Sequence, residues 1–269
     1  MAMIGRCQKK SYFRKIMGGS SKLEKNDGLF DFKGSTTELE EKICDEGRPC
    51  PSIVLLYARM GLHRYNLLEG TKFELRRVKK YVISQDAGVA AADYFITLDA
   101  AIGSSFQTFQ TRVTEESFGF FILRSNIARI RGDSSAGRRG VLLDHSLPEW
   151  PAENPFENHY LVKESDHDWI RLYMELVVAT EDWSRKAEDS GPSKLEIVKV
   201  AMDSNGEGPD AINAVFYLRF KDFYMAQIGK ALDRFAIVRR RFDEVKGCFS
   251  LVGSEVTASM DSQMIALHL

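Results

Sequence analysis

Apolar residues return every three or four positions between residues 52 and 70, which is the spacing of one face of an α-helix. Pro51 stands where a helix can begin and Gly70 where one can end. Gly61 lies inside this predicted helix, although glycine costs about 1 kcal/mol relative to alanine there. We therefore expect Gly61 to approach another backbone closely, as when a helix lies on a sheet. The apolar positions are Ile53, Leu56, Tyr57, Met60, Leu67 and Leu68, with Arg64 as the polar exception.

Four segments with the two-residue alternation of β-strands follow this helix. In the clearest of them Tyr94, Ile96 and Leu98 face one side, and Phe95 and Thr97 face the other. Turn residues such as Asp86, Gly88 and Gly103 separate the segments, so we expect an antiparallel meander beside the helix. The predicted strands are 73–84, 93–101, 106–114 and 118–130.

The same order of elements returns after residue 164. Ser165 to Asp168 form a capping-box pattern, and apolar residues from Trp169 to Trp183 recur at helical spacing. The sequence therefore predicts an α+β fold made of two halves, each with a helix packed on an antiparallel sheet. The strand-like runs of the second half are 195–202, 214–220, 235–242 and 248–252.

A polar stretch between the two halves marks the expected internal boundary. Residues 131–140 are rich in glycine, arginine and serine, and Pro148, Pro151 and Pro155 are typical of an extended connector. In the leader, Thr36 to Asp45 has the composition of a short helix. The predicted organisation is a partly disordered leader over 1–47, a first half over 48–130, a connector over 131–164, a second half over 165–254 and a tail over 255–269.

The amino-acid composition limits which binding partners and which cellular compartment we expect for this chain. Lysine plus arginine number 37 and aspartate plus glutamate 38, so no global field favours nucleic acid as a partner. No apolar run is long enough to cross a bilayer, and we expect no membrane insertion. The cysteines lack metal or redox spacing, which favours a reducing intracellular compartment, the cytoplasm or the nucleus. The basic N-terminus mildly resembles a transit peptide, and a mobile basic arm is the favoured interpretation.

The segment Tyr57-Ala58-Arg59-Met60-Gly61-Leu62-His63-Arg64-Tyr65-Asn66 resembles the helix signature of plant cystatins. The likeness continues through Phe73 to Lys80 and into Tyr94 to Ala100, and in register it covers about residues 52–130. This resemblance implies a cystatin-like helix and sheet in the first half.

A second resemblance spans most of residues 25–252. Leu56 to Thr71, Ala214 to Lys221 and Ala236 to Arg240 are similar to a plant family of unknown function that is expanded in crucifers. That family includes an embryo-defective protein and the male-sterility-five meiosis proteins. The resemblance implies a plant source and a role in embryo or reproductive development, and it implies no catalytic residues.

Cystatins grip cysteine proteases with a Gln-x-Val-x-Gly hairpin and a Pro-Trp hairpin. In the aligned positions only Val89 agrees with the first hairpin, and Glu115 and Glu116 stand where the second should be. Two carboxylates would lose hydration on entering a protease cleft. Protease inhibition is therefore the alternative function, and these three residues are candidate interaction positions.

Other chemistry-bearing residues have no convergent pattern. The histidines lack metal-ligand spacing, so we expect no metal, no cofactor and no catalytic residue. The run Arg239-Arg240-Arg241 indicates binding of nucleic acid or of an acidic partner, or nuclear import, or else, as favoured here, a sheet edge protected by charge. Four nearby aromatic residues either form a base-stacking platform or pack beneath a helix: Tyr217, Phe220, Phe223 and Tyr224.

The sequence thus favours a non-enzymatic protein-interaction module that binds partners through sheet edges or hairpin tips. Its protein partners and its oligomeric state stay open.

Overall fold

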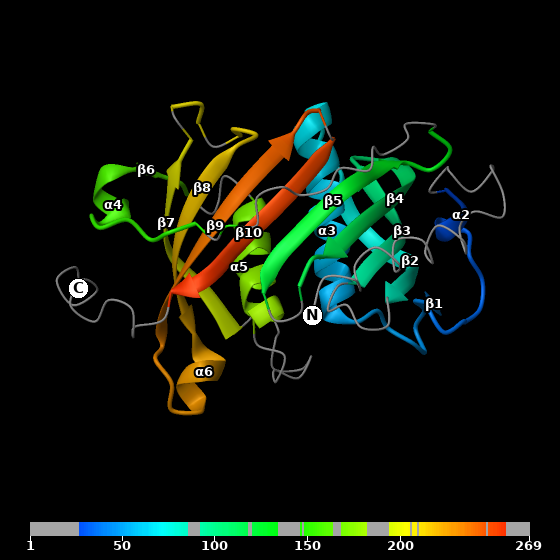
Figure 1. Ribbon diagram of the computed structural model, residues 1–269, viewed down its shortest axis with the longest axis horizontal. Coiled ribbons are helices and arrows are strands. Elements are labelled where there is room, and N and C mark those ends of the chain that lie inside the picture. Colours follow the sequence, from blue (N-terminus) through cyan, green and yellow to red (C-terminus); the bar gives the residue numbers. More distant parts are fainter. Residues whose placement is uncertain are drawn as a thin grey trace, which may run out of the picture.

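The computed structural model describes residues 27–85, 92–117, 120–133, 146, 148–163, 168–181, 194–204, 206–208, 210–245 and 247–256. Its strands form one ten-stranded antiparallel sheet in the order β1-β2-β3-β4-β5-β10-β9-β8-β7-β6 (Figure 1). The strands are β1 (Leu39–Ile43), β2 (Glu74–Gln85), β3 (Ala92–Ile102), β4 (Ser105–Glu115), β5 (Phe121–Ile130), β6 (Tyr160–Leu161), β7 (Leu195–Asp203), β8 (Ala214–Asp222), β9 (Asp233–Asp243) and β10 (Cys248–Val256).

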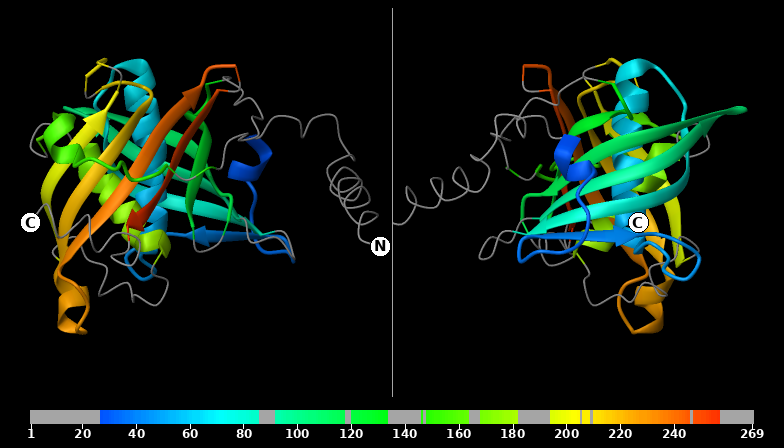
Figure 2. Two further views of the ribbon diagram at one scale, coloured as in Figure 1. Left: turned by 60° about the vertical axis from the view of Figure 1, so that its left-hand side comes forward. Right: turned by 90° about the vertical axis from the view of Figure 1, so that its right-hand side faces the viewer.

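Two long helices cover the same face of this sheet, which curves around them (Figures 1 and 2). They are α3 (Ser52–Glu69) and α5 (Asp168–Glu181), and both coincide with predicted helices. Gly70 ends α3 in the left-handed conformation, with φ of 63°. The apolar faces of both helices enter one core with the inner side of the sheet, including Tyr57, Met60, Tyr173, Leu176, Ile96, Phe109, Phe216 and Leu251.

Gly61 marks the closest approach of α3 to the sheet. A methyl group on its Cα would lie 2.7 Å from Cγ2 of Thr111 in β4 and would overlap the rest of that side chain. The expected close approach of the helix to the sheet is therefore confirmed, but the neighbour is a strand side chain and not a backbone. A glycine that is unfavourable for the isolated helix is required by its packing.

The predicted fold of two cystatin-like, helix-on-sheet halves is wrong. β5 pairs with β10, with Ser125 opposite Phe249 and Phe121 opposite Gly253, so that the two meanders share one sheet. The result is a β-rich architecture built on a single continuous sheet. The physical reason is that β5 and β10 would each expose a row of unpaired backbone groups, and pairing with each other satisfies both rows.

The predicted helix over Thr36 to Asp45 is also wrong, because residues 39–43 form the edge strand β1. Glu40 and Lys42 alternate with Leu39 and Glu41, and Glu41 pairs with Lys80 of β2 at 2.9 Å between Oε1 and Nζ. Charged residues on an edge strand are typical because they discourage further pairing. Short elements that the sequence reading did not find are α2 (Asp27–Phe30), α4 (Pro155–Asn158) and α6 (Phe223–Gln227).

The outer face of the sheet carries two smaller apolar clusters. Phe30 of α2 packs on Val82, Phe95 and Ile127. At the other end of the sheet Trp150 and Phe156 of the connector pack against a second cluster, made of Ala201, Tyr217 and Ile237. The connector therefore has packed structure over part of its length.

Cys44 and Cys50 form a disulfide bond with a Cα–Cα distance of 5.1 Å, between the end of β1 and the start of α3. The expectation of reduced cysteines is therefore wrong for this pair, so cysteine usage no longer supports a reducing compartment. Cys248 is buried, and burial raises the pKa of its thiol to about 11. In the described ranges, no helix has the length and hydropathy needed to span a membrane.

Candidate functional site

The connection between β8 and β9 projects beyond the end of the sheet as a compact hairpin tip that contains α6 (Figures 1 and 2). We call residues 223–230 the α6 tip. The backbone closes on itself there: the amides of Ile228 and Lys230 both donate to the carbonyl oxygen of Met225, at 3.2 and 3.0 Å. Gly229 has φ of 79°, a value that glycine adopts without strain.

A buried acidic side chain holds the α6 tip to the sheet. Asp222 is fully buried, and its Oδ1 accepts a hydrogen bond from the amide of Met225 at 3.1 Å, which caps α6. Its Oδ2 accepts from Nη1 of Arg234 at 2.8 Å, and Arg234 also pairs with Glu255 of β10. Since Met225 is buried as well, the tip is fixed by an apolar anchor and a three-residue charged network.

The α6 tip presents apolar side chains to solvent. Phe223 is 38% exposed and Ile228 is 53% exposed, although both residue types usually occupy a core. Apolar groups held outward on a rigid support are typical anchors of protein interfaces, since little conformational entropy is lost on binding. A second tip, between β3 and β4, exposes Phe106 by 68%. In the strands beside it Asp99 pairs with Arg77 and Lys79, whose side chains are 70% and 38% exposed, so this charged network lies nearer to solvent than that of the α6 tip.

The arginine run 239–241 does not form one basic patch. Side chains alternate along β9, so Arg240 points into the core and is fully buried. Arg239 lies on the outer face, where its Nη2 donates to the carbonyl oxygen of Ser146 at 2.8 Å, and Arg241 is exposed. β9 pairs with β8 on one side and β10 on the other, so the expectation that this run protects a sheet edge is wrong.

Arg240 is enclosed by aromatic rings from α5 and β8. Its guanidinium carbon lies 4.7 Å from the ring centroid of Trp169 and 4.9 Å from that of Phe216. Nη1 also donates to the hydroxyl of Tyr173 at 3.2 Å. Cation–π contacts and hydrogen bonds of this kind compensate the loss of hydration, and they make Arg240 a structural residue.

His63 of α3 joins the same polar cluster. Its Nε2 lies 2.8 Å from the hydroxyl of Tyr173, and burial together with the charge of Arg240 lowers the pKa of His63 to about 3. Beside it, Arg59 of α3 forms an ion pair with the buried Glu175 of α5. A neutral histidine packed among aromatic rings and tied to a neighbouring helix is suited to holding α3 and α5 together.

Glu115 and Glu116 have different surroundings. Glu115 points inward and accepts a hydrogen bond from the hydroxyl of Tyr57, and burial raises the pKa of its carboxyl. Glu116 pairs with Arg124 at 2.6 Å between Oε1 and Nη2. The third candidate of the inhibitory wedge, Val89, lies outside the described residues.

The remaining predicted features are dispersed. Phe220 points into the core and Tyr217 points to the outer face, so these aromatics do not form one stacking platform. His159 stacks on Tyr217 with ring centroids 5.3 Å apart. His145, His167 and His268 lie outside the described residues. In the part of the chain that is described, no three His, Cys, Asp or Glu side chains gather as a metal site would require.

Sequence reasoning missed the α6 tip as a site. The available signal for a capped turn is Asp222 at the end of a strand, followed by the four apolar residues 223–226 and then by Gly229. The exposure of Phe223 and Ile228 has no sequence signal, because the same residues are equally compatible with a buried helix face.

Comparisons with known proteins agree on one family. The family model described as Protein MS5 matches residues 147–251. UPF0725 protein At3g25080 of Arabidopsis thaliana is 56% identical over 162 residues, covering 58% of this chain and 94% of that protein. UPF0725 protein EMB2204 of the same plant is 38% identical over 224 residues, covering 76% of this chain and 67% of that protein.

A solved structure gives the same result for the fold. The crystal structure of MS5 from Brassica napus aligns with a TM-score of 0.61 and 32% sequence identity, covering 77% of this chain and 98% of that chain. The predicted resemblance to the crucifer-expanded plant family is confirmed, whereas none of these matches supports the resemblance to cystatins.

Proposed function

This chain belongs to the plant family of MS5 and UPF0725 proteins, and on that premise we propose that it is a non-enzymatic module that binds another protein through the α6 tip. The observation that carries the proposal is the exposure of Phe223 and Ile228 on a turn fixed by Asp222, Arg234 and Glu255. In this proposal the two side chains enter an apolar cleft of the partner, and the rigid support limits the entropy lost on binding.

The buried ionisable groups favour a binding role over a catalytic one. His63 is held by Tyr173, Glu115 by Tyr57, and Arg240 by aromatic rings and Tyr173. Each of these groups is engaged in packing between α3, α5 and the sheet. We extend the proposal to a role without catalytic residues, cofactor or metal.

The membership in this plant family suggests the biological process in which the protein acts. The names of its members, together with the resemblance to embryo-defective and male-sterility-five proteins, support a role in embryo or reproductive development, including meiosis. We propose an intracellular location, in the cytoplasm or the nucleus, with a protein as the partner. Nucleic acid is not favoured because Arg240 is buried and Arg239 is bonded to Ser146.

The alternative of a cysteine-protease inhibitor is not favoured. Glu115 is buried against Tyr57 and therefore does not project from the molecule as a protease-gripping tip must. An assay of papain-like proteases with micromolar protein tests this alternative directly, and we expect full protease activity.

The test of the proposed function compares three forms of the full chain in proximity labelling of developing flowers and embryos. These are the wild type, the double variant Phe223→Ala with Ile228→Ala, and the matched control Phe106→Ala on the other exposed tip. Because exposed substitutions change stability by only about 0.5 kcal/mol, all three forms should fold alike.

We expect a set of labelled proteins that the wild type and the Phe106→Ala control share and that the double variant loses. The partner identified in that set should bind the purified wild type and fail to bind the purified double variant. An identical set of labelled proteins for all three forms would contradict the proposed function.

A further inference from the structure

The outer face of the first meander holds a segment of the chain's own N-terminal region much as a protein holds a bound peptide. Phe30 is only 1% exposed and fills a pocket formed by Val82, Phe95 and Ile127. Its ring meets that of Phe95 edge to face, with centroids 5.4 Å apart. We call this site the Phe30 pocket.

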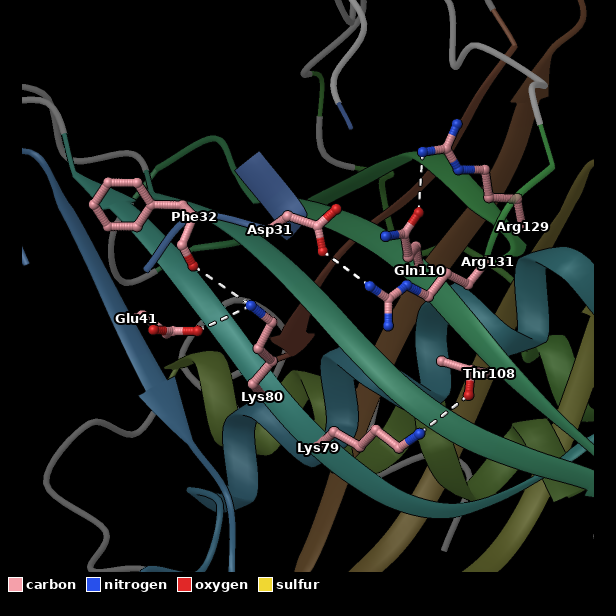
Figure 3. Close-up of polar contacts among 9 residues, drawn as sticks. All are labelled: Asp31, Phe32, Glu41, Lys79, Lys80, Thr108, Gln110, Arg129 and Arg131. Carbon is pink, nitrogen blue, oxygen red and sulfur yellow. Dashed lines mark hydrogen bonds and ion pairs between the residues drawn. The ribbon is translucent and has the colours of Figure 1, made fainter. Parts of the chain in front are cut away.

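Basic side chains of the sheet contact the two residues that directly follow Phe30, which are Asp31 and Phe32 (Figure 3). Nη2 of Arg131 lies 3.1 Å from Oδ1 of Asp31, and Nζ of Lys80 lies 3.4 Å from the carbonyl oxygen of Phe32. The guanidinium of Arg129 lies 5.9 Å from the Phe30 ring centroid and donates to Gln110 at 3.0 Å. An aromatic anchor, a carboxylate and a backbone carbonyl are thus each recognised separately.

The segment and its site are distant in sequence, since Asp31 and Arg131 are 100 residues apart. The helix that carries Phe30, α2, has only four residues, so it contributes little stability of its own. The ion pair between Asp31 and Arg131 is 59% and 54% exposed, and exposed pairs of this kind are weak. The segment is therefore held mainly by apolar packing, with Phe30 fully buried and Leu29 and Phe32 partly buried against the same cluster.

We propose that the Phe30 pocket is a docking site for a short segment of another protein in which an aromatic residue is followed by a carboxylate. In the free protein the chain's own residues Leu29 to Phe32 occupy the Phe30 pocket. The inference is independent of the α6 tip, because it concerns the opposite end of the sheet and different residues. Lys80 is already paired with Glu41, and the positive charge of Arg129 and Arg131 favours an acidic segment over a neutral one.

The test uses a fluorescent peptide with the sequence of residues 27–34, titrated into the full chain and followed by fluorescence anisotropy. The wild type should bind weakly, since the tethered segment competes at a high effective concentration. The variant Phe30→Ala weakens that competitor and should bind roughly tenfold or more tightly. A peptide with alanine in place of its phenylalanine at position 30 should show no saturable binding.

Two further variants of the Phe30→Ala chain test the charges. Arg131→Glu should weaken peptide binding by about tenfold, because it replaces the partner of the peptide carboxylate with a like charge. Arg48→Glu is the matched control, since Arg48 is an exposed arginine paired with Asp45 away from the pocket. It should leave the affinity unchanged.

A second variant that keeps Phe30 tests the proposal even if Phe30→Ala fails to fold. Asp31→Lys removes only the exposed ion pair and should give a peptide affinity between those of the wild type and Phe30→Ala. Circular dichroism should first show that Phe30→Ala and Asp31→Lys are folded like the wild type. If neither of these two folded variants binds the peptide saturably, the proposal is overturned. Light scattering adds a second outcome. If the wild type has the mass of a dimer and Phe30→Ala has the mass of a monomer, the pocket binds Phe30 of a second copy of this chain. That result would overturn the proposal that a segment of another protein binds there.

Discussion

The hydroxyl of Tyr173 lies 2.8 Å from Nε2 of His63 and so joins helix α5 to helix α3 across 110 residues of sequence. The same hydroxyl accepts a hydrogen bond from Arg240 of β9 at 3.2 Å. One phenol thus links both helices to the shared sheet. This buried cluster gives the single-sheet architecture a polar centre that two separate halves would lack.

Stability should fall as the pH drops below the ordinary pKa of histidine. The pKa of His63 is lowered to about 3 in the folded protein, whereas in the unfolded chain it is about 6.5. The unfolded state therefore binds more protons between these values, and acid favours unfolding. We expect the free energy of unfolding to be about 1–2 kcal/mol lower at pH 5 than at pH 7.5 from this residue. His63→Gln should show a shallower pH dependence in urea titrations, and equal slopes would contradict the assignment.

The two neighbouring arginines of β9 should differ sharply in their effect on stability. Arg240→Met removes the hydrogen bonds to Tyr173 and Ala211 and leaves a buried polar cluster without its cation. A buried polar group left without its partner costs about 1–3 kcal/mol, so we expect Arg240→Met to cost about 2–4 kcal/mol. Arg241→Met, on the exposed face, should change stability by about 0.5 kcal/mol or less. Guanidinium denaturation of both variants tests this, and equal costs would contradict the inward position of Arg240.

Alanine at position 61 should destabilise the protein although it favours the isolated helix. The added methyl group overlaps Thr111, and overpacking of this kind costs about 1–3 kcal/mol beyond the gain in helix propensity. Gly70→Ala is the control, since its cost of about 1 kcal/mol comes from the left-handed backbone and no atom lies within 4 Å. Thermal unfolding measures the stability of the double variants. Adding Thr111→Gly should recover part of the stability lost in Gly61→Ala and none of the stability lost in Gly70→Ala.

Neutralising the two adjacent glutamates should have opposite effects at neutral pH. Because burial raises the pKa of Glu115, the stability that this residue contributes is lost as the pH rises through its folded-state pKa. Glu115→Gln should therefore equal or exceed the wild type in stability at pH 7 and lose that advantage at pH 4. Glu116→Gln removes the carboxylate beside Arg124 and should cost about 1–2 kcal/mol at pH 7. Denaturant titrations at both pH values check the sign, and a loss of stability in Glu115→Gln at pH 7 would contradict it.

Local patterns were sufficient to place the main elements. The helix over Ser52–Glu69 and the strands that follow it were predicted from apolar spacing, because a helix and a strand repeat their environment every 3.6 and 2.0 residues. Even Gly61 was interpreted correctly as a contact position. The short edge strand β1 was mistaken for a helix, since its five residues are too few for the alternation to outweigh the glutamates around it.

The sequence by itself determined the approximate positions of the two long helices and the long strands, and to which family the chain belongs. Only the tertiary structure decided that β5 pairs with β10, that Arg240 is buried while Arg241 is exposed, and that Phe223 and Ile228 face solvent. The reason is that strand edges pair through backbone groups, which every residue type carries, so the choice of partner leaves no pattern along the chain. Which side of a strand faces the core is fixed only once that pairing has formed.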